Sequence, residues 1–127
     1  MASGLAETAA GLALLFVPNI VLVLLLGLTS AATETLLVGR VAGSALLAIG
    51  VACWLARNDA RTPTQAGLLG GILIYNLAVT ILLGWAGAVL AMTGICLWPG
   101  VALHAALAAW CCVVVASKRG SGDRGKA

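Results

Sequence analysis

Four long apolar stretches constrain what this chain can fold into more than any other feature of its sequence. They run from about residue 5 to 28, 36 to 56, 66 to 90 and 97 to 116. Each is long enough to cross a hydrocarbon layer of roughly 30 Å as a helix that rises about 1.5 Å per residue. Because backbone groups in lipid need partners within their own segment, we expect four α-helices. The sequence therefore predicts an all-α integral membrane protein, built as an antiparallel four-helix bundle.

The composition also indicates lipid as the main solvent of the chain. Hydrophobic residues make up 62% of the 127 residues and charged residues 9%, whereas soluble domains carry roughly 25% charge. So few charges cannot cover the surface of a soluble domain of this size. We expect one transmembrane domain at 1–117 and a polar cytoplasmic tail at 118–127, whose Gly-rich composition is typical of disorder.

The basic residues predict the orientation in the membrane. Six of the seven lie in the second connection or the tail, whereas the first and third connections hold none. These six are Arg57, Arg61, Lys118, Arg119, Arg124 and Lys126. Because cytoplasmic segments carry an excess of Lys and Arg, this pattern predicts a multi-pass protein of the plasma (inner) membrane with both termini in the cytoplasm. The small net charge and the lack of a basic stripe exclude nucleic acid as an expected partner.

The first apolar stretch contains two local features. Glu7 lies near its cytoplasmic start, where the helix dipole favours a carboxylate. Pro18 lies in its interior, where a proline removes one backbone hydrogen bond and can kink the helix. A cleaved signal peptide would have a basic start and a shorter apolar run, so we expect this stretch to be retained as a helix.

Small residues mark where the helices approach one another, since helix association in lipid depends on close packing. The second stretch has such a stripe, and the third begins with one. In the fourth stretch, the stripe of small residues also contains the histidine. The packing residues are Gly39, Gly43, Gly50, Gly67, Gly71 and Gly100. Such stripes serve packing within a chain and association between chains alike. The expected partners are the lipid bilayer and other membrane-protein chains, or a second copy of this one.

Four polar residues inside the apolar stretches are the candidate site residues, because polar groups are costly in lipid. They are Asn19, Arg40, Asn76 and His104. Counted from the helix ends, they fall between the middle of the membrane and its outer surface. We hypothesise that they line one polar pocket open to the outside. Interhelical hydrogen bonds by the asparagines, and snorkelling of Arg40 or its pairing with Glu34, are the structural alternatives.

His104 is the only histidine, and three roles are compatible with its position. It can relay protons, bind a metal or haem, or stay neutral and hydrogen-bond to Asn76 or Asn19. One histidine cannot supply both axial ligands of a haem, and Cys111 lies about 10 Å away along the helix, too far to share a metal ion. We therefore expect no metal and no cofactor.

Three stretches resemble a group of known proteins over the whole length of the chain. They are VGRVAGSALLAIGVACWLARND, GLLGGILIYNLAV and LWPGVALHAALAAWC. The chain is similar to small, uncharacterised four-helix inner-membrane proteins of Gram-negative bacteria, which have no assigned activity. This resemblance implies a bacterial membrane protein and transfers no catalytic residue.

The sequence contains no nucleophile–base pair, no paired carboxylates, no phosphate-binding loop and no metal-ligand pattern. We therefore expect a non-enzymatic protein, either an accessory or scaffolding subunit of a larger membrane complex or a self-associating helix bundle. The alternative is a small transporter or channel that uses the four polar residues. A carrier needs polar groups on both sides of the membrane, and the inner half has none apart from the helix ends.

Overall fold

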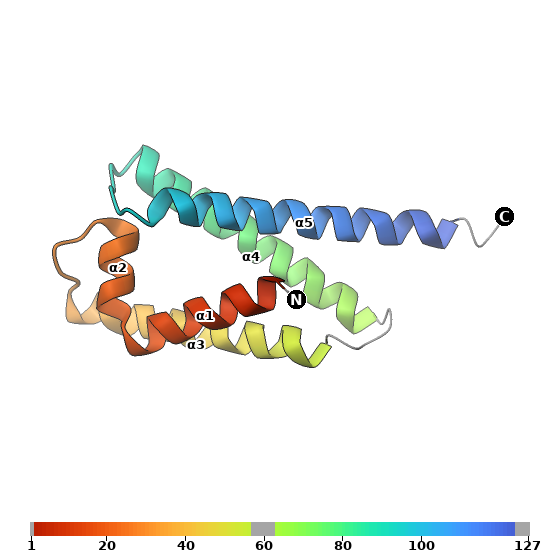
Figure 1. The fold of residues 1–127 in the computed structure, drawn as a ribbon, viewed down its shortest axis with the longest axis horizontal. Coiled ribbons are helices and arrows are strands. Elements are labelled where there is room, and N and C mark those ends of the chain that lie inside the picture. Colours follow the sequence, from red (N-terminus) through yellow and green to blue (C-terminus); the bar gives the residue numbers. More distant parts are fainter. Residues whose placement is uncertain (1, 57–62, 124–127) are drawn as a thin grey trace.

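The computed structural model describes residues 2–56 and 63–123, and within them it contains five α-helices (Figure 1). They are α1 (Ala2–Phe16), α2 (Pro18–Leu26), α3 (Thr33–Leu55), α4 (Pro63–Ala88) and α5 (Leu97–Asp123). No strand occurs among the described residues. The predicted all-α class is therefore confirmed.

Three of the helices, α3, α4 and α5, are long and apolar enough to cross a membrane. The 23 residues of α3, at about 1.5 Å each, extend over roughly 35 Å, somewhat more than a hydrocarbon layer. These helices are consistent with a multi-pass membrane protein. A fourth span is present only if α1 and α2, which are bent against each other, count as one.

The first apolar stretch differs from its prediction, because it forms two helices in place of one. The helix direction bends by 112° between α1 and α2. Pro18 has no N–H to continue the helix, and a residue that precedes proline is driven away from helical dihedral angles. Val17 accordingly has φ −128° and ψ 50°. The prediction of a continuous helix over 5–28 was therefore wrong.

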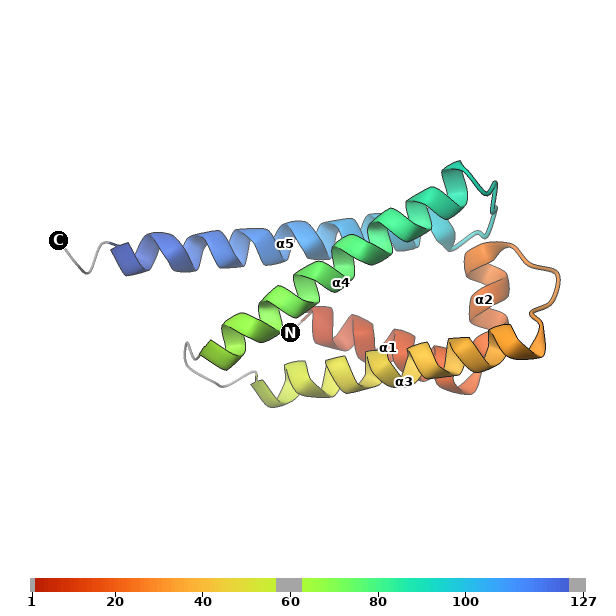
Figure 2. The ribbon, with the colours of Figure 1, turned by 180° about the vertical axis from the view of Figure 1, so that it is seen from behind.

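The helices form two antiparallel pairs, with α1 lying along α3 and α4 lying along α5 (Figures 1 and 2). The extensive helix contacts fall within these pairs. Short α2 runs across one end of the molecule and contacts both α3 and α5, so it joins the two pairs. We call this end, where the connections 27–32 and 89–96 also lie, the α2 end.

The α2 end is held by backbone contacts between the two pairs. Gly27 ends α2 with φ 73°, a left-handed conformation that glycine adopts without strain. The last turn of α2 leaves carbonyl groups without a partner in the helix, and the Leu24 carbonyl accepts a hydrogen bond of 2.9 Å from the Cys96 N–H. Leu97, which begins α5, is completely buried beside this contact. The connection before α5 thereby fixes α2 across the end of the molecule.

The other predicted helices agree with the structure to within a few residues, except at the end of α5. The tail from 118 onward was predicted to be disordered, whereas α5 continues as a helix to Asp123. A helix that is already nucleated gains one backbone bond for each residue it fixes, and residues 118–123 contain no proline to stop it. Residues 57–62 and 124–127 lie outside the described part of the chain, and they include four of the six basic residues from which the orientation was predicted.

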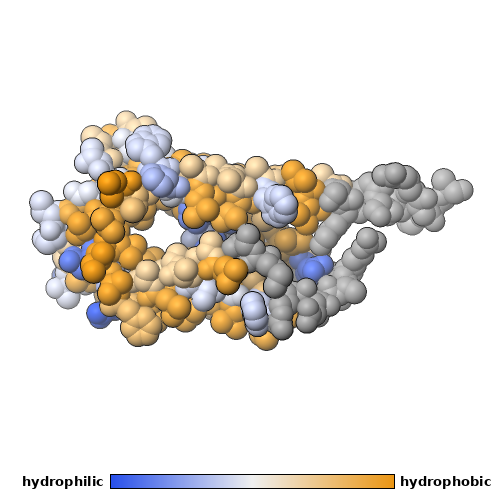
Figure 3. Space-filling model, in the orientation of Figure 1, coloured by the Kyte–Doolittle hydropathy of each residue, from blue (hydrophilic) through white to orange (hydrophobic). Residues whose placement is uncertain are grey.

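Apolar side chains cover most of the visible surface, and hydrophilic residues gather at the α2 end and between the pairs (Figure 3). Large side chains such as Phe16, Leu55 and Ile95 are more than two-thirds exposed. An apolar surface this extensive marks contact with lipid or with another protein. Figure 3 also shows an opening through the molecule between α1, α2 and α5.

Candidate functional site

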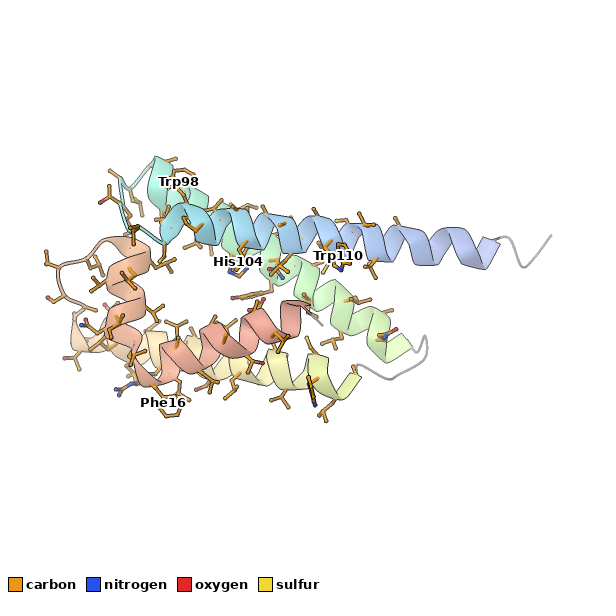
Figure 4. The ribbon with its side chains drawn as sticks, viewed as in Figure 1. Phe16, Trp98, His104 and Trp110 are labelled. Carbon is orange, nitrogen blue, oxygen red and sulfur yellow. The ribbon has the colours of Figure 1, made fainter. Side chains whose placement is uncertain are left out.

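The polar centre of the molecule is a hydrogen bond between α4 and α5. Nδ1 of His104 lies 2.8 Å from Oδ1 of Asn76. Asn76 is completely buried, and its Nδ2 donates to the Ile72 carbonyl one turn earlier at 2.8 Å. His104 points from α5 into the space between the helices (Figure 4). The sequence proposed that His104 bonds either Asn76 or Asn19, and the structure places it on Asn76.

These two hydrogen bonds define which nitrogen of His104 carries the proton. Because the amide nitrogen of Asn76 is engaged by Ile72, its oxygen faces the ring and can only accept. Nδ1 therefore donates, and Nε2 of the neutral ring is left as an acceptor. The Tyr75 ring stands edge-on to His104, with centroids 5.8 Å apart and planes at 79°. Such an edge-to-face contact is a favourable aromatic geometry and limits rotation of the imidazole.

The other two candidate residues lie elsewhere and have other partners. Asn19 is exposed on α2, and its Oδ1 accepts a hydrogen bond of 3.3 Å from the Ala31 N–H. This bond holds the connection 27–32 against α2. Arg40 is exposed on α3. The structure therefore brings Asn76 and His104 together and leaves Asn19 and Arg40 at the surface.

Sequence reasoning missed Glu7 as an interior residue. It was expected to serve as a charge on the first turn of its helix, whereas α1 begins at Ala2 and has no acidic residue in its first turn. Glu7 is only 1% exposed, and its Oε1 is buried without a hydrogen-bond partner. The sequence did contain an indication that Glu7 is buried, because its spacing from Gly4 and Gly11 places all three residues on one helix face.

The glycine stripes differ in what they contact. On α3, Gly39, Gly43 and Gly50 are buried. A Cβ atom added at Gly43 would lie 2.8 Å from the carbonyl oxygen of Gly11, so α1 and α3 touch at their backbones there. Only a glycine permits such an approach.

The glycines of α4 have the opposite environment. A Cβ added at Gly67, Gly70, Gly71 or Gly84 would meet no atom of the described residues within 4 Å. At 100° per residue, Gly67, Gly70 and Gly71 lie on the side of α4 opposite Asn76, with Ile74 and Ile81 beside them, whereas Gly84 lies at the edge of this side. Ile74 and Ile81 are 70% and 68% exposed. We call this the open face of α4. Gly100 differs again, since an added Cβ would contact Leu83 and Leu25 at 3.4 and 3.5 Å.

The remaining reactive groups give no sign of a metal centre. The four cysteines are free thiols, and the described residues contain no group of three His, Cys, Asp or Glu side chains placed to hold a metal ion. An apolar groove of about 210 Å³ lies between α1 and α3, where Leu5, Val51 and Trp54 are among its lining residues. Groups in the interior that can exchange a proton include Glu7, Tyr75, His104 and the thiols of Cys53 and Cys111.

Comparison with known proteins adds no family to this description. No protein-family model, no curated protein and no solved structure matches the chain.

Proposed function

We propose that the protein is a non-enzymatic, multi-pass membrane protein that works by binding another membrane-protein chain, or a second copy of itself, through the open face of α4. The observation that carries this proposal is the contrast between the two glycine stripes. One stripe is used for backbone contact between α1 and α3, and the other, of similar composition, has none of the described residues against it.

The physical argument starts from the weak driving force between helices in lipid. Apolar side chains gain nothing by leaving lipid for a neighbouring helix, so association relies on close van der Waals contact. Gly67 and Gly71 form a flat surface one turn apart, and a helix docked there can approach as closely as α1 approaches α3. An accessory or scaffolding subunit and a self-associating bundle both use such a face.

The loose connection between the helix pairs supports the same proposal. Outside the two pairs, the contacts in the structure centre on α2, and an opening remains between α1, α2 and α5 (Figure 3). A chain that packs its helices incompletely in isolation gains stability from a partner. Docking on α4 would hold the second pair in a fixed position.

The alternative is a small transporter or channel with a polar pocket formed by Asn19, Arg40, Asn76 and His104. The buried Asn76–His104 contact favours it. It has less support than association, because Asn19 and Arg40 are exposed on separate helices.

A bulky residue on the open face of α4 tests the proposal. In mild detergent we expect the wild-type chain to appear in native mass spectrometry as a homodimer or with a second membrane protein. Gly71→Leu is expected to weaken this association by about tenfold or more, because a docked helix can no longer approach. Ala42→Leu, which adds the same side chain at an exposed position of α3, is the control. A wild-type chain that stays monomeric, or association that Gly71→Leu leaves unchanged, contradicts the proposal.

We further propose that the protein lies in the plasma (inner) membrane with both termini in the cytoplasm, as the basic residues predict. The α2 end then faces outward. Cys96 is exposed there, so a membrane-impermeant maleimide added to intact spheroplasts is expected to label it. Cys96→Ala should abolish this labelling, since the other three cysteines lie within the helices. Labelling of Cys96 only after the membrane is permeabilised would reverse the proposed orientation.

A further inference from the structure

Glu7 is the one polar group of the interior that the described contacts leave unexplained. Nearly all buried polar atoms in proteins have a hydrogen-bond partner, and an exception indicates a missing ligand or a functional role. The carboxyl of Glu7 is buried, and its Oε1 accepts no hydrogen bond from the described residues. Removing a carboxylate from water costs several kcal/mol unless a positive charge or a proton accompanies it.

Two neutral donors of the interior, the Thr8 hydroxyl and the Asn76 amide, are engaged with groups other than Glu7. The Thr8 hydroxyl, next to Glu7 in the chain, donates to the Gly4 carbonyl at 2.7 Å. The amide of Asn76 donates to Ile72. The Oε1 acceptor of Glu7, which receives no hydrogen bond from the described residues, is therefore available to a further donor.

Arg40 cannot neutralise Glu7 either. It is the only Lys or Arg whose side chain the structure describes. The contacts of Gly4 with Cys53 and of Gly11 with the Leu47 backbone place Glu7 level with residues 47–53 of α3. Arg40 lies seven residues before Leu47, about 10 Å farther along the helix, and it is exposed.

The surroundings of Glu7 come from more than one helix. Glu7 lies level with Cys53 of α3, and it is close enough to the Tyr75 hydroxyl of α4 for the two groups to interact electrostatically. Tyr75 also contacts His104 of α5. Glu7 thus lies where the two helix pairs face each other, and aromatic rings beside a carboxylate attract organic cations.

We propose that Glu7 is the binding group for a primary ammonium ligand, which enters between the two helix pairs with Tyr75 beside it. A primary ammonium supplies a positive charge for the carboxylate and N–H donors for its unpartnered oxygen. A quaternary ammonium supplies only the charge. The binding group of this site is distinct from the open face of α4, because Glu7 lies on α1, although Tyr75 belongs to α4.

The test uses the full chain in mild detergent and two probes, n-butylammonium and tetramethylammonium. By titration calorimetry we expect n-butylammonium to bind the wild-type protein, and tetramethylammonium to bind about tenfold more weakly because it has no N–H. Glu7→Gln is expected to weaken n-butylammonium binding by about thirtyfold or more, since it removes the charge that pairs with the ligand. Glu34→Gln, at an exposed carboxylate of α3, is the matched control and should leave binding unchanged.

A second measurement does not depend on the folding of any variant. Dicyclohexylcarbodiimide, which modifies carboxyl groups in apolar surroundings, is expected to label Glu7 of the wild-type protein, as peptide mass spectrometry would detect. Excess n-butylammonium should protect Glu7, and tetramethylammonium should protect it much less. Absence of n-butylammonium binding to the wild-type protein, equal binding by Glu7→Gln, or labelling of Glu7 without protection would each overturn the proposal.

Discussion

Replacing Gly43 with leucine is expected to separate α1 from α3 and to destabilise the protein by about 3 kcal/mol or more, at the upper end of the cost of overpacking. A Cβ at this position would lie 2.8 Å from both the Gly11 carbonyl oxygen and the Leu15 backbone nitrogen. Both are backbone atoms and cannot rotate away as a side chain does. The whole of α1 must therefore move outward, and the contacts along the pair are lost with it.

A disulfide between α1 and α3 can report this separation. A Cβ built at Gly4 lies 2.9 Å from the Cβ of Cys53, and disulfides join Cβ atoms about 3.8 Å apart. The Gly4→Cys variant should therefore form a disulfide with Cys53 on mild oxidation after a small shift of the helices. Adding Gly43→Leu is expected to abolish this bond, as peptide mapping would show. Unfolding in increasing SDS, followed by circular dichroism, gives the change in stability.

Gly71→Leu is the matched control for this experiment, because nothing lies within 4 Å of a Cβ at Gly71. It should leave the disulfide between α1 and α3 and the unfolding transition of the monomer unchanged. If Gly43→Leu retained both the disulfide and the wild-type stability, the close contact of α1 with α3 would be disproved.

The two glycine stripes show what a sequence motif can and cannot predict. Gly39-x-x-x-Gly43 and Gly67-x-x-x-Gly71 have the same spacing, and both satisfy the requirement for close helix contact. Only the first has a helix against it in the structure. The spacing describes the shape of one helix surface, whereas its occupant depends on how the whole chain is arranged.

The long helices were predictable because their signal is local and extends over many residues. Length and apolar composition suffice for α3, α4 and α5. The break at Pro18 was only partly predictable, since proline explains why the helix ends but not why the chain turns by 112°. That direction depends on contacts distant in sequence, such as the hydrogen bond from Cys96 to Leu24.

Glu7 shows how counting from a helix end can mislead. A carboxylate early in a helix fits a favourable charge on the dipole, and this explanation needs no other residue. Whether Glu7 is buried depends instead on which helix packs against the face that it shares with Gly4 and Gly11. Asn76 and His104 were recognised as polar residues of the interior, but which partner each would take required the positions of α4 and α5.

Replacing Asn76 with leucine is expected to cost about 1–3 kcal/mol of stability, the penalty for a buried hydrogen-bonding group left without its partner. Asn76→Leu removes the acceptor of His104 Nδ1 and leaves that N–H in an apolar interior. His104→Leu removes the donor instead, and it leaves the Asn76 side-chain oxygen without this hydrogen bond. In the double variant both polar groups are gone, so its cost should be smaller than the sum of the two single costs.

The sum of the two single-variant costs minus the cost of the double variant is the coupling energy of the pair. We expect a coupling energy of roughly 1–2 kcal/mol, near the upper limit measured for such bonds in membranes. SDS unfolding of all four proteins would measure it. Thr80→Val is the control, because its hydroxyl only adds a second bond to the Asn76 backbone carbonyl. It should show no coupling to His104→Leu. Strictly additive effects of Asn76→Leu and His104→Leu would mean that the two side chains do not meet, and the pairing of α4 with α5 at this level would have to be abandoned.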